Sequence, residues 1–235
     1  MTAPQRIRYR FDLPDGTARV LDFEFTAREF QLTNAVPEEP PFWAELDFNR
    51  CPNCPLDAAA HRCCPPALHM ADAVEKLQAL VSFDAVDVAV DVAGRRICAR
   101  TSVQEALSSV LGLIMATAGC PWTDRLRPMA RFHLPFADET ETVYRSVSMY
   151  LLAAQVVGMR VGSDFAQLED LYRNLHLVNR HMARRLGAAT QTDPARNAIA
   201  LLDVYTALLP AALENSLADL EPLFAAWRGA PTAAI

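Results

Sequence analysis

The chain changes its hydrophobic period near residue 102, and this change limits the folds that it can adopt. Before this point apolar and polar residues alternate, as in "ARVLDFEF" (18–25) and "DAVDVAVDV" (84–92). A period of two is typical of strands with one buried face. After it, apolar residues recur every three or four positions, as in amphipathic helices. Strands followed by helices favour an α+β fold.

Two hairpins account for the predicted strands. In the first, "RIRYRFDL" and "ARVLDFEF" flank "PDGT", whose Asp15–Gly16 pair is a strong hairpin signal. In the second, "DAVDVAVDV" turns at Ala93–Gly94 and returns as "RRICART". We therefore expect an N-terminal antiparallel sheet of about four strands. A long irregular, cysteine-rich loop at about 31–65 separates the hairpins, followed by a helix near 67–81.

Helix-start signals divide the C-terminal part. Four of them occur: Ser102 with Glu105, Asp138 with Glu141, Asp164 with Gln167, and Asp193 before Pro194. We expect Pro210 to end or kink the last of these helices, and a final helix to run to about Trp227. The sequence thus predicts a single α+β unit, 1–235, in which a sheet-rich part, 1–101, precedes a helical bundle, 102–235.

Charge and hydropathy exclude some classes of partner. The net charge is -6 and the pI is about 5.4, so we expect no nucleic-acid partner. The N-terminus carries no visible secretory signal, and the longest apolar run, Met149–Met159, is too short to span a bilayer. We expect a cytoplasmic protein without a membrane partner, whose partner is an unknown protein or small molecule. The sequence leaves the oligomeric state open.

The stretch "CPNCPLDAAAHRCCPP" (51–66) holds four of the six cysteines. Cys51, Cys54, Cys64 and the distant Cys120 each precede a proline, whereas fewer than one such pair is expected by chance from six cysteines and 16 prolines in 235 residues. A residue before proline is held in extended geometry, which presents its side chain from a stiff backbone. Cys98 lies in a predicted strand and is expected to be a small buried apolar residue.

These four cysteines predict a metal site, because the cytoplasm keeps thiols reduced and Cys-x-x-Cys lets two sulfurs bind one ion. His61 is an alternative to Cys120 as the fourth ligand. Structural zinc is favoured because it is the commoner occupant of four-cysteine sites. The alternative is an iron–sulfur redox or sensor protein on the same ligands, since Cys-Pro pairs occur at such clusters.

Other functions have weaker support in the sequence. "CPNC" looks like the motif of glutaredoxin-type enzymes, but Pro55 and the loop-like sequence after it do not suit the helix that such a motif opens. No glycine-rich phosphate loop and no G-x-S-x-G motif occurs. We predict no catalytic residue and favour a non-enzymatic interaction or regulatory protein. An enzyme with a pocket in the helical part is the remaining possibility.

Three stretches, "CPNCPL", "SSVLGLIMATAGCP" and "RPMARFHLPFA", resemble a family of bacterial cytoplasmic proteins classed as a domain of unknown function. The likeness covers nearly the whole chain. It implies one structural unit and draws attention to the Cys-Pro motifs, and it implies no activity or cofactor.

Overall fold

A four-stranded antiparallel sheet forms one layer of the molecule, as the sequence predicts. The computed structural model describes residues 5–160, 165–189 and 193–228. The strands are β1 (Gln5–Asp12), β2 (Ala18–Phe25), β3 (Ala85–Val92) and β4 (Arg95–Ser102), in the spatial order β2-β1-β3-β4. The two hairpins pair through β1 and β3, so the sheet is antiparallel throughout.

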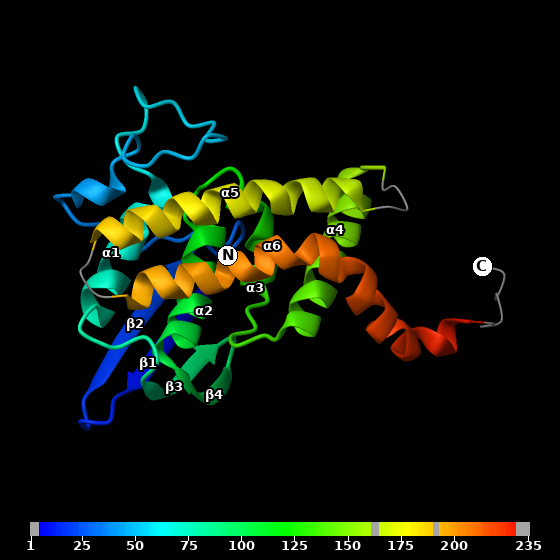
Figure 1. Cartoon of the computed structure of the whole chain (residues 1–235), viewed down its shortest axis with the longest axis horizontal. Helices are drawn as coiled ribbons and strands as arrows, with labels where there is room; N and C mark the ends of the chain where they lie inside the picture. Colours follow the sequence, from blue (N-terminus) through cyan, green and yellow to red (C-terminus); the bar gives the residue numbers. More distant parts are fainter. Residues whose placement is uncertain (1–4, 161–164, 190–192, 229–235) are drawn as a thin grey trace.

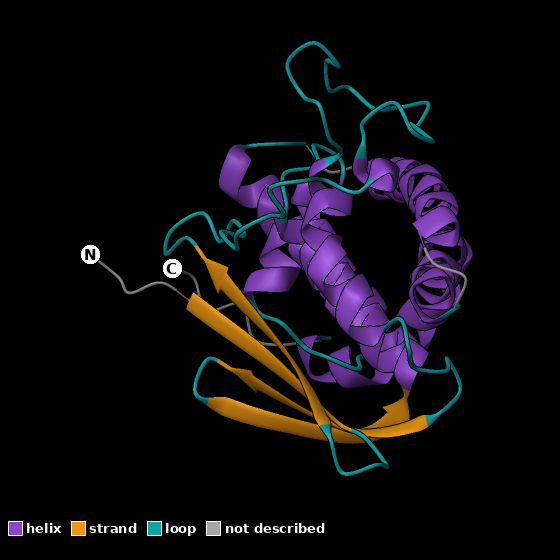
Figure 2. Ribbon diagram, turned by 90° about the vertical axis from the view of Figure 1, so that its left-hand side faces the viewer, coloured by secondary structure: helices purple, strands orange, loops and turns teal. Residues whose placement is uncertain are grey.

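The alternation in β1 separates the two faces of the sheet. Ile7, Tyr9 and Phe11 are buried, while the arginines between them are exposed. Arg6 and Arg8 lie directly opposite Glu24 and Asp22 of β2 and form ion pairs with them. One face therefore carries charged pairs, and the helices cover the other (Figure 2).

Six α-helices and three short 3₁₀ helices make up the described remainder of the fold (Figure 1). The α-helices are α1 (Pro65–Leu77), α2 (Val103–Thr117), α3 (Arg127–Arg131), α4 (Glu139–Val157), α5 (Ala166–Ala189) and α6 (Pro194–Leu220). The 3₁₀ helices are η1 (Phe42–Ala44), η2 (Thr123–Leu126) and η3 (Glu221–Trp227). Helices α5 and α6 run side by side, and α2 packs against α6, α1 and the strands.

The predicted helix starts are confirmed where the structure describes them. Ser102 and Glu105 form a complete capping box at α2, and Asp138 and Glu141 form another at α4. Asp193 precedes Pro194 at the start of α6. Asp164 of the remaining signal lies outside the described residues.

Two details of the predicted helices are wrong. The helix expected near 67–81 begins at Pro65 and ends at Leu77. Of the two outcomes expected at Pro210, an end of the helix is wrong, since α6 continues to Leu220, but the helix bends in its second half (Figure 1). The final segment runs to Trp227, as expected, but as a 3₁₀ helix. Proline removes one backbone donor, a loss that the neighbouring turns of a long helix can tolerate.

One hydrophobic core joins the sheet to the helices. It includes the inward-facing residues of β1, β2 and β3, together with residues of α1, α2, α5 and α6. A second, smaller cluster holds α4 against α5 through residues such as Val143, Tyr150 and Leu175. None of the described helices is both long and apolar enough to cross a membrane.

A half-buried histidine ties the sheet to the segment after α3. His133 Nε2 hydrogen-bonds the hydroxyl of Tyr9, which is completely buried. Burial, aided by the charge of Arg145, lowers the pKa of His133 to about 3 from an ordinary value of 6.5. The imidazole is therefore neutral in the folded protein at neutral pH.

We expect His133 to make the fold acid-sensitive. Its pKa is lower in the folded than in the unfolded chain, so its contribution to stability is complete above about pH 6.5 and is lost as the pH falls towards 3. The loss is at most about 1.4 kcal/mol per pH unit. Urea unfolding of His133→Gln should show a shallower decline below pH 6.5 than the wild type. His61→Gln, at an exposed position, is the control. Parallel pH profiles for wild type and His133→Gln would contradict this assignment.

Candidate metal centre

The cysteine-rich loop lies against α5, and its outer part projects from the helical body (Figures 1 and 2). The Arg185 side chain of α5 is 1% exposed and holds the start of this loop. Its Nη1 donates to the carbonyls of Trp43 (2.8 Å) and Glu45 (2.6 Å), and its Nη2 donates to that of Leu46 (2.7 Å). A guanidinium satisfies such a set of carbonyls because its donors are fixed in a planar fork.

Two more polar residues on the same face of α5 contact the loop. Asn174 and His181 precede Arg185 by eleven and four positions, which places all three on one side of the helix. Asn53 Nδ2 donates to the Asn174 side-chain oxygen (3.0 Å), and His181 Nδ1 lies 3.1 Å from the carbonyl oxygen of Asn49. Helix α5 therefore holds the loop along its length.

The first two predicted ligands lie at the ends of one tight turn. The amide of Cys54 donates to the carbonyl of Cys51 (3.0 Å). Between them, the carbonyl of Asn53 accepts a hydrogen bond of 2.7 Å from the indole Nε1 of Trp122. This bond ties the Cys51–Cys54 turn to the segment that carries Cys120.

Cys64 and Cys120 also come from neighbouring segments. Cys64 is the residue before α1, and its amide donates to the carbonyl of Ala44 (2.8 Å). Gly119 adopts a left-handed conformation (φ +93°), and a Cβ at this position would lie 3.9 Å from Cβ of Pro65. The chain after Cys64 thus lies beside the chain before Cys120.

The thiols of this region influence one another. Burial is the largest cause that raises the pKa of Cys51 to about 12; the charges of Cys64, Cys120 and Cys54 contribute to this rise, and Arg185 opposes it. Burial also raises the pKa of Cys64, against the Ala67 amide and Arg185, and Cys120 and Cys54 add to the rise. Cys51 is therefore within range of the charges of the other three cysteines, and Cys64 is within range of those of Cys120 and Cys54.

The sulfurs are not gathered into a coordination sphere. Within residues 5–160, 165–189 and 193–228, no three His, Cys, Asp or Glu side chains are arranged as they would be around a metal ion. His61, the alternative ligand, is exposed, and its Nδ1 lies 3.3 Å from the carbonyl oxygen of Asp57 in its own turn.

The other two cysteines lie elsewhere. Cys98 is in β4, as predicted, but it is exposed, so the expectation that it is buried is wrong. The alternation places Cys98 with Arg96 and Arg100 on the charged face of the sheet, away from the helices. Cys63 forms an isolated β-bridge with Glu45.

The surroundings of Cys51 and Cys54 do not suit thiol–disulfide catalysis. A nucleophilic thiol needs a lowered pKa, which a helix N-terminus commonly supplies. Here the pKa of Cys51 is raised, and Cys51–Cys54 forms a turn in a loop rather than the start of a helix.

Sequence reasoning missed the residues of α5 that hold the loop. The available signal was weak: polar residues at positions 174, 181 and 185 share a face of a strongly amphipathic helix. The helix also carries several solvent-exposed arginines, and nothing in the sequence separates Arg185 from them.

Comparison with known proteins gives a family. The model of a domain of unknown function (DUF6901) matches residues 7–225. No curated protein and no solved structure matches the chain significantly.

Proposed function

The chain belongs to the DUF6901 family, a domain of unknown function, and we propose that it binds one structural metal ion, zinc, through Cys51, Cys54, Cys64 and Cys120. The observation that carries this proposal is the convergence of three separate segments. The Asn53–Trp122 hydrogen bond and the close approach of Gly119 to Pro65 connect the segments that carry the four thiols.

We propose that a rearrangement of the loop brings the four sulfurs around one ion. Zinc binds four cysteine sulfurs tetrahedrally at about 2.3 Å. The charges of the other three thiols add to the raised pKa of Cys51, and Cys51, Cys64 and Cys120 pack against the same core. A metal ion would displace the thiol protons and draw the sulfurs inward, since metal binding is coupled to deprotonation and folding.

The buried charge of Arg185 favours an anionic centre beside it. No carboxylate pairs with Arg185 in the described part of the chain, although its side chain is almost inaccessible. Its charge favours the thiolate forms of Cys51 and Cys64. A zinc ion with four thiolates carries a net charge of about -2. Arg185 would offset part of that charge in a region of low dielectric constant.

The metal would hold the projecting loop against α5 and α2. We propose that this surface serves an interaction or regulatory role in the cytoplasm, where thiols stay available to zinc. The alternative is an iron–sulfur redox or sensor protein on the same four cysteines. Visible colour separates them, since a zinc protein is colourless and an iron–sulfur protein is brown.

We expect Cys54→Ser to lose most of the bound zinc. Serine keeps the size of the side chain but removes one of four sulfur ligands, and affinity falls steeply when a closed zinc site loses a ligand. Elemental analysis of protein purified anaerobically without added metal should give about one zinc per wild-type chain. Far less should remain in the variant.

Cys98→Ala is the matched control, because Cys98 lies on the exposed face of β4. It should retain the full zinc content. Equal metal content in wild type and Cys54→Ser, or metal loss in Cys98→Ala, would show that the wrong cysteines were assigned. His61→Ala should also retain zinc if Cys120 is the fourth ligand.

A further inference from the structure

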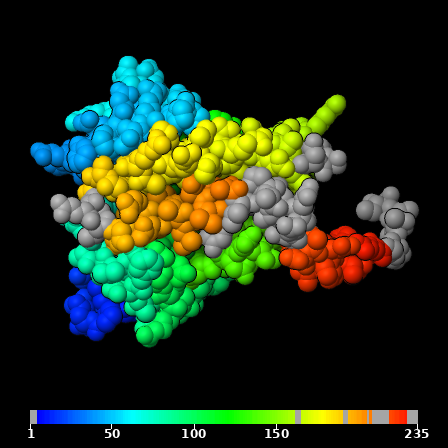
Figure 3. All heavy atoms as spheres, in the orientation of Figure 1, coloured from blue at the N-terminus to red at the C-terminus, as the bar shows by residue number. Residues whose placement is uncertain are grey.

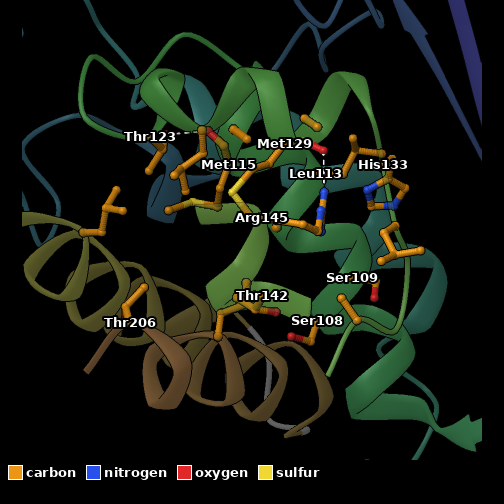
Figure 4. Close-up of a pocket in the computed structure, with 18 of the residues that line it drawn as sticks. Ser108, Ser109, Leu113, Met115, Thr123, Met129, His133, Thr142, Arg145 and Thr206 are labelled. Carbon is orange, nitrogen blue, oxygen red and sulfur yellow. Dashed lines mark hydrogen bonds between the residues drawn. The ribbon is translucent and has the colours of Figure 1, made fainter. Parts of the chain in front are cut away.

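A cavity of about 190 Å³ lies within the helical part (Figure 4). It is enclosed by α2, α4, α5 and α6, and the segment from η2 to residue 137 closes one side. In the space-filling view, helices α5 and α6 lie side by side on the face of the molecule turned to the viewer (Figure 3). The half-exposed residues of its lining, such as Met129, Leu134 and Thr142, lie on the α3–α4 side and mark its entrance.

The wall of the cavity is mainly apolar. Its lining includes Leu113, Met115, Leu126, Leu175 and Leu202. Several polar groups of the lining are already engaged with the protein. For example, Thr123 Oγ1 donates to the carbonyl of Met115, and Ser109 Oγ accepts from the amide of Phe136. The wall therefore suits a ligand with a hydrocarbon body.

Arg145 brings a positive charge to this apolar space. Its Nη2 donates to the carbonyls of Met129 (2.7 Å) and Phe132 (3.2 Å), and Figure 4 shows the guanidinium directed towards α3 at the cavity. In the described structure both of its hydrogen bonds to protein come from Nη2, so Nε and Nη1 keep donors for a ligand. No described residue of the lining is an aspartate or glutamate.

The neighbouring histidine does not change this charge balance. His133 lines the same cavity, and burial keeps it neutral at physiological pH by lowering its pKa to about 3. Burial also lowers the pKa of Arg145, against the charges of Tyr172 and Glu141. The guanidinium is thus costly to bury without an anion, and an anionic ligand would relieve that cost.

We propose that this cavity binds a short-chain monocarboxylate, with its carboxylate on Arg145 and its hydrocarbon chain between α2, α5 and α6. Charge complementarity selects the anion, since a guanidinium donates two parallel hydrogen bonds to a carboxylate. Size selects the chain: about 190 Å³ holds roughly six groups of the size of water, at about 30 Å³ each. A chain of about six carbons fits this volume.

Calorimetric titration with hexanoate tests the proposal, with hexan-1-ol and hexylamine as neutral and cationic probes of equal length. We expect saturable binding of hexanoate and no binding of hexylamine. Hexan-1-ol lacks the negative charge, so it should bind at least about tenfold more weakly than hexanoate, which corresponds to about 1.4 kcal/mol. Equal binding of hexanoate and hexylamine, or no binding of hexanoate at millimolar concentration, would overturn the proposal.

Two variants locate the site. Arg145→Gln should weaken hexanoate at least about tenfold and leave hexan-1-ol unchanged, whereas Arg173→Gln, on the exposed side of α5, should change neither. If Arg145→Gln does not fold, Met129→Trp serves instead, because a larger side chain at the entrance should weaken both ligands. Unchanged hexanoate affinity in a folded Arg145→Gln or in Met129→Trp would place the binding elsewhere and refute the site. The metal centre is not involved, so loss of zinc binding in Cys54→Ser bears on the other proposal alone.

Discussion

Replacing Arg185 by methionine is expected to lower the free energy of unfolding by about 3–5 kcal/mol. This is the largest effect that we expect from any single substitution. Methionine retains the apolar stem of the side chain but donates no hydrogen bond. The carbonyls of Trp43 and Leu46 would then be left without their donor in the protein interior, while the carbonyl of Glu45 would keep only the amide of Phe48. Each buried, unsatisfied carbonyl costs about 1–3 kcal/mol.

The neighbouring Arg184 provides a matched control. It is exposed, and its contact with His181 Nε2 is long at 3.5 Å. Arg184→Met should change the stability by less than about 0.5 kcal/mol. Denaturant unfolding of both variants, each saturated with metal, gives the comparison. If Arg185→Met were as stable as Arg184→Met, the proposed role of Arg185 in holding the loop would be wrong.

Arg185→Lys adds a second comparison. Lysine keeps the positive charge but lacks the planar fork that reaches several carbonyls at once. We expect its stability to fall between those of wild type and Arg185→Met. A full recovery with lysine would mean that charge, rather than the hydrogen bonds to the loop, accounts for the effect.

Removing the metal is expected to expose the loop to trypsin. With a chelator and a thiol reductant present, cleavage after Arg50 and Arg62 should rise at least about tenfold, which corresponds to a loss of about 1.4 kcal/mol in the local opening free energy. These residues flank the ligands on the projecting part of the loop. Without the ion, only Arg185, His181 and the Asn53 contacts would hold it.

Cleavage after Arg228 is the internal control, because this residue is exposed in the C-terminal segment and far from the cysteines in sequence. Its rate should not change with the chelator, and added zinc should restore protection at Arg50 and Arg62. Identical cleavage patterns with and without chelator would argue that no ion holds the loop.

The fold could be predicted from the sequence because its elements carry local signals. Alternation in β1 to β3 and the turn residues Asp15–Gly16 determine the sheet, and the capping boxes at Ser102 and Asp138 start α2 and α4. Pro210 does not end α6, because one missing backbone donor does not outweigh the contacts of α6 with α2 and α5. Cys98 misled the prediction because the strand period alone does not say which face is covered.

The candidate site could be predicted only in part. The Cys-Pro pairs are local and single out four thiols, but the described residues hold no group of side chains arranged around a metal ion, so the site stays a proposal. The residues that hold the loop are not local, since Arg185 lies more than a hundred positions from the carbonyls it binds. The cavity at Arg145 is lined by residues from at least four helices, so no single stretch of sequence predicts it.

X-ray absorption at the zinc edge tests the central claim most directly, on protein purified anaerobically and reduced. The account predicts one zinc ion with four sulfur neighbours at about 2.3 Å and no nitrogen or oxygen in the first shell. A metal-free protein, or a shell that includes nitrogen at about 2.0–2.1 Å, would contradict the assignment of Cys51, Cys54, Cys64 and Cys120 as its ligands.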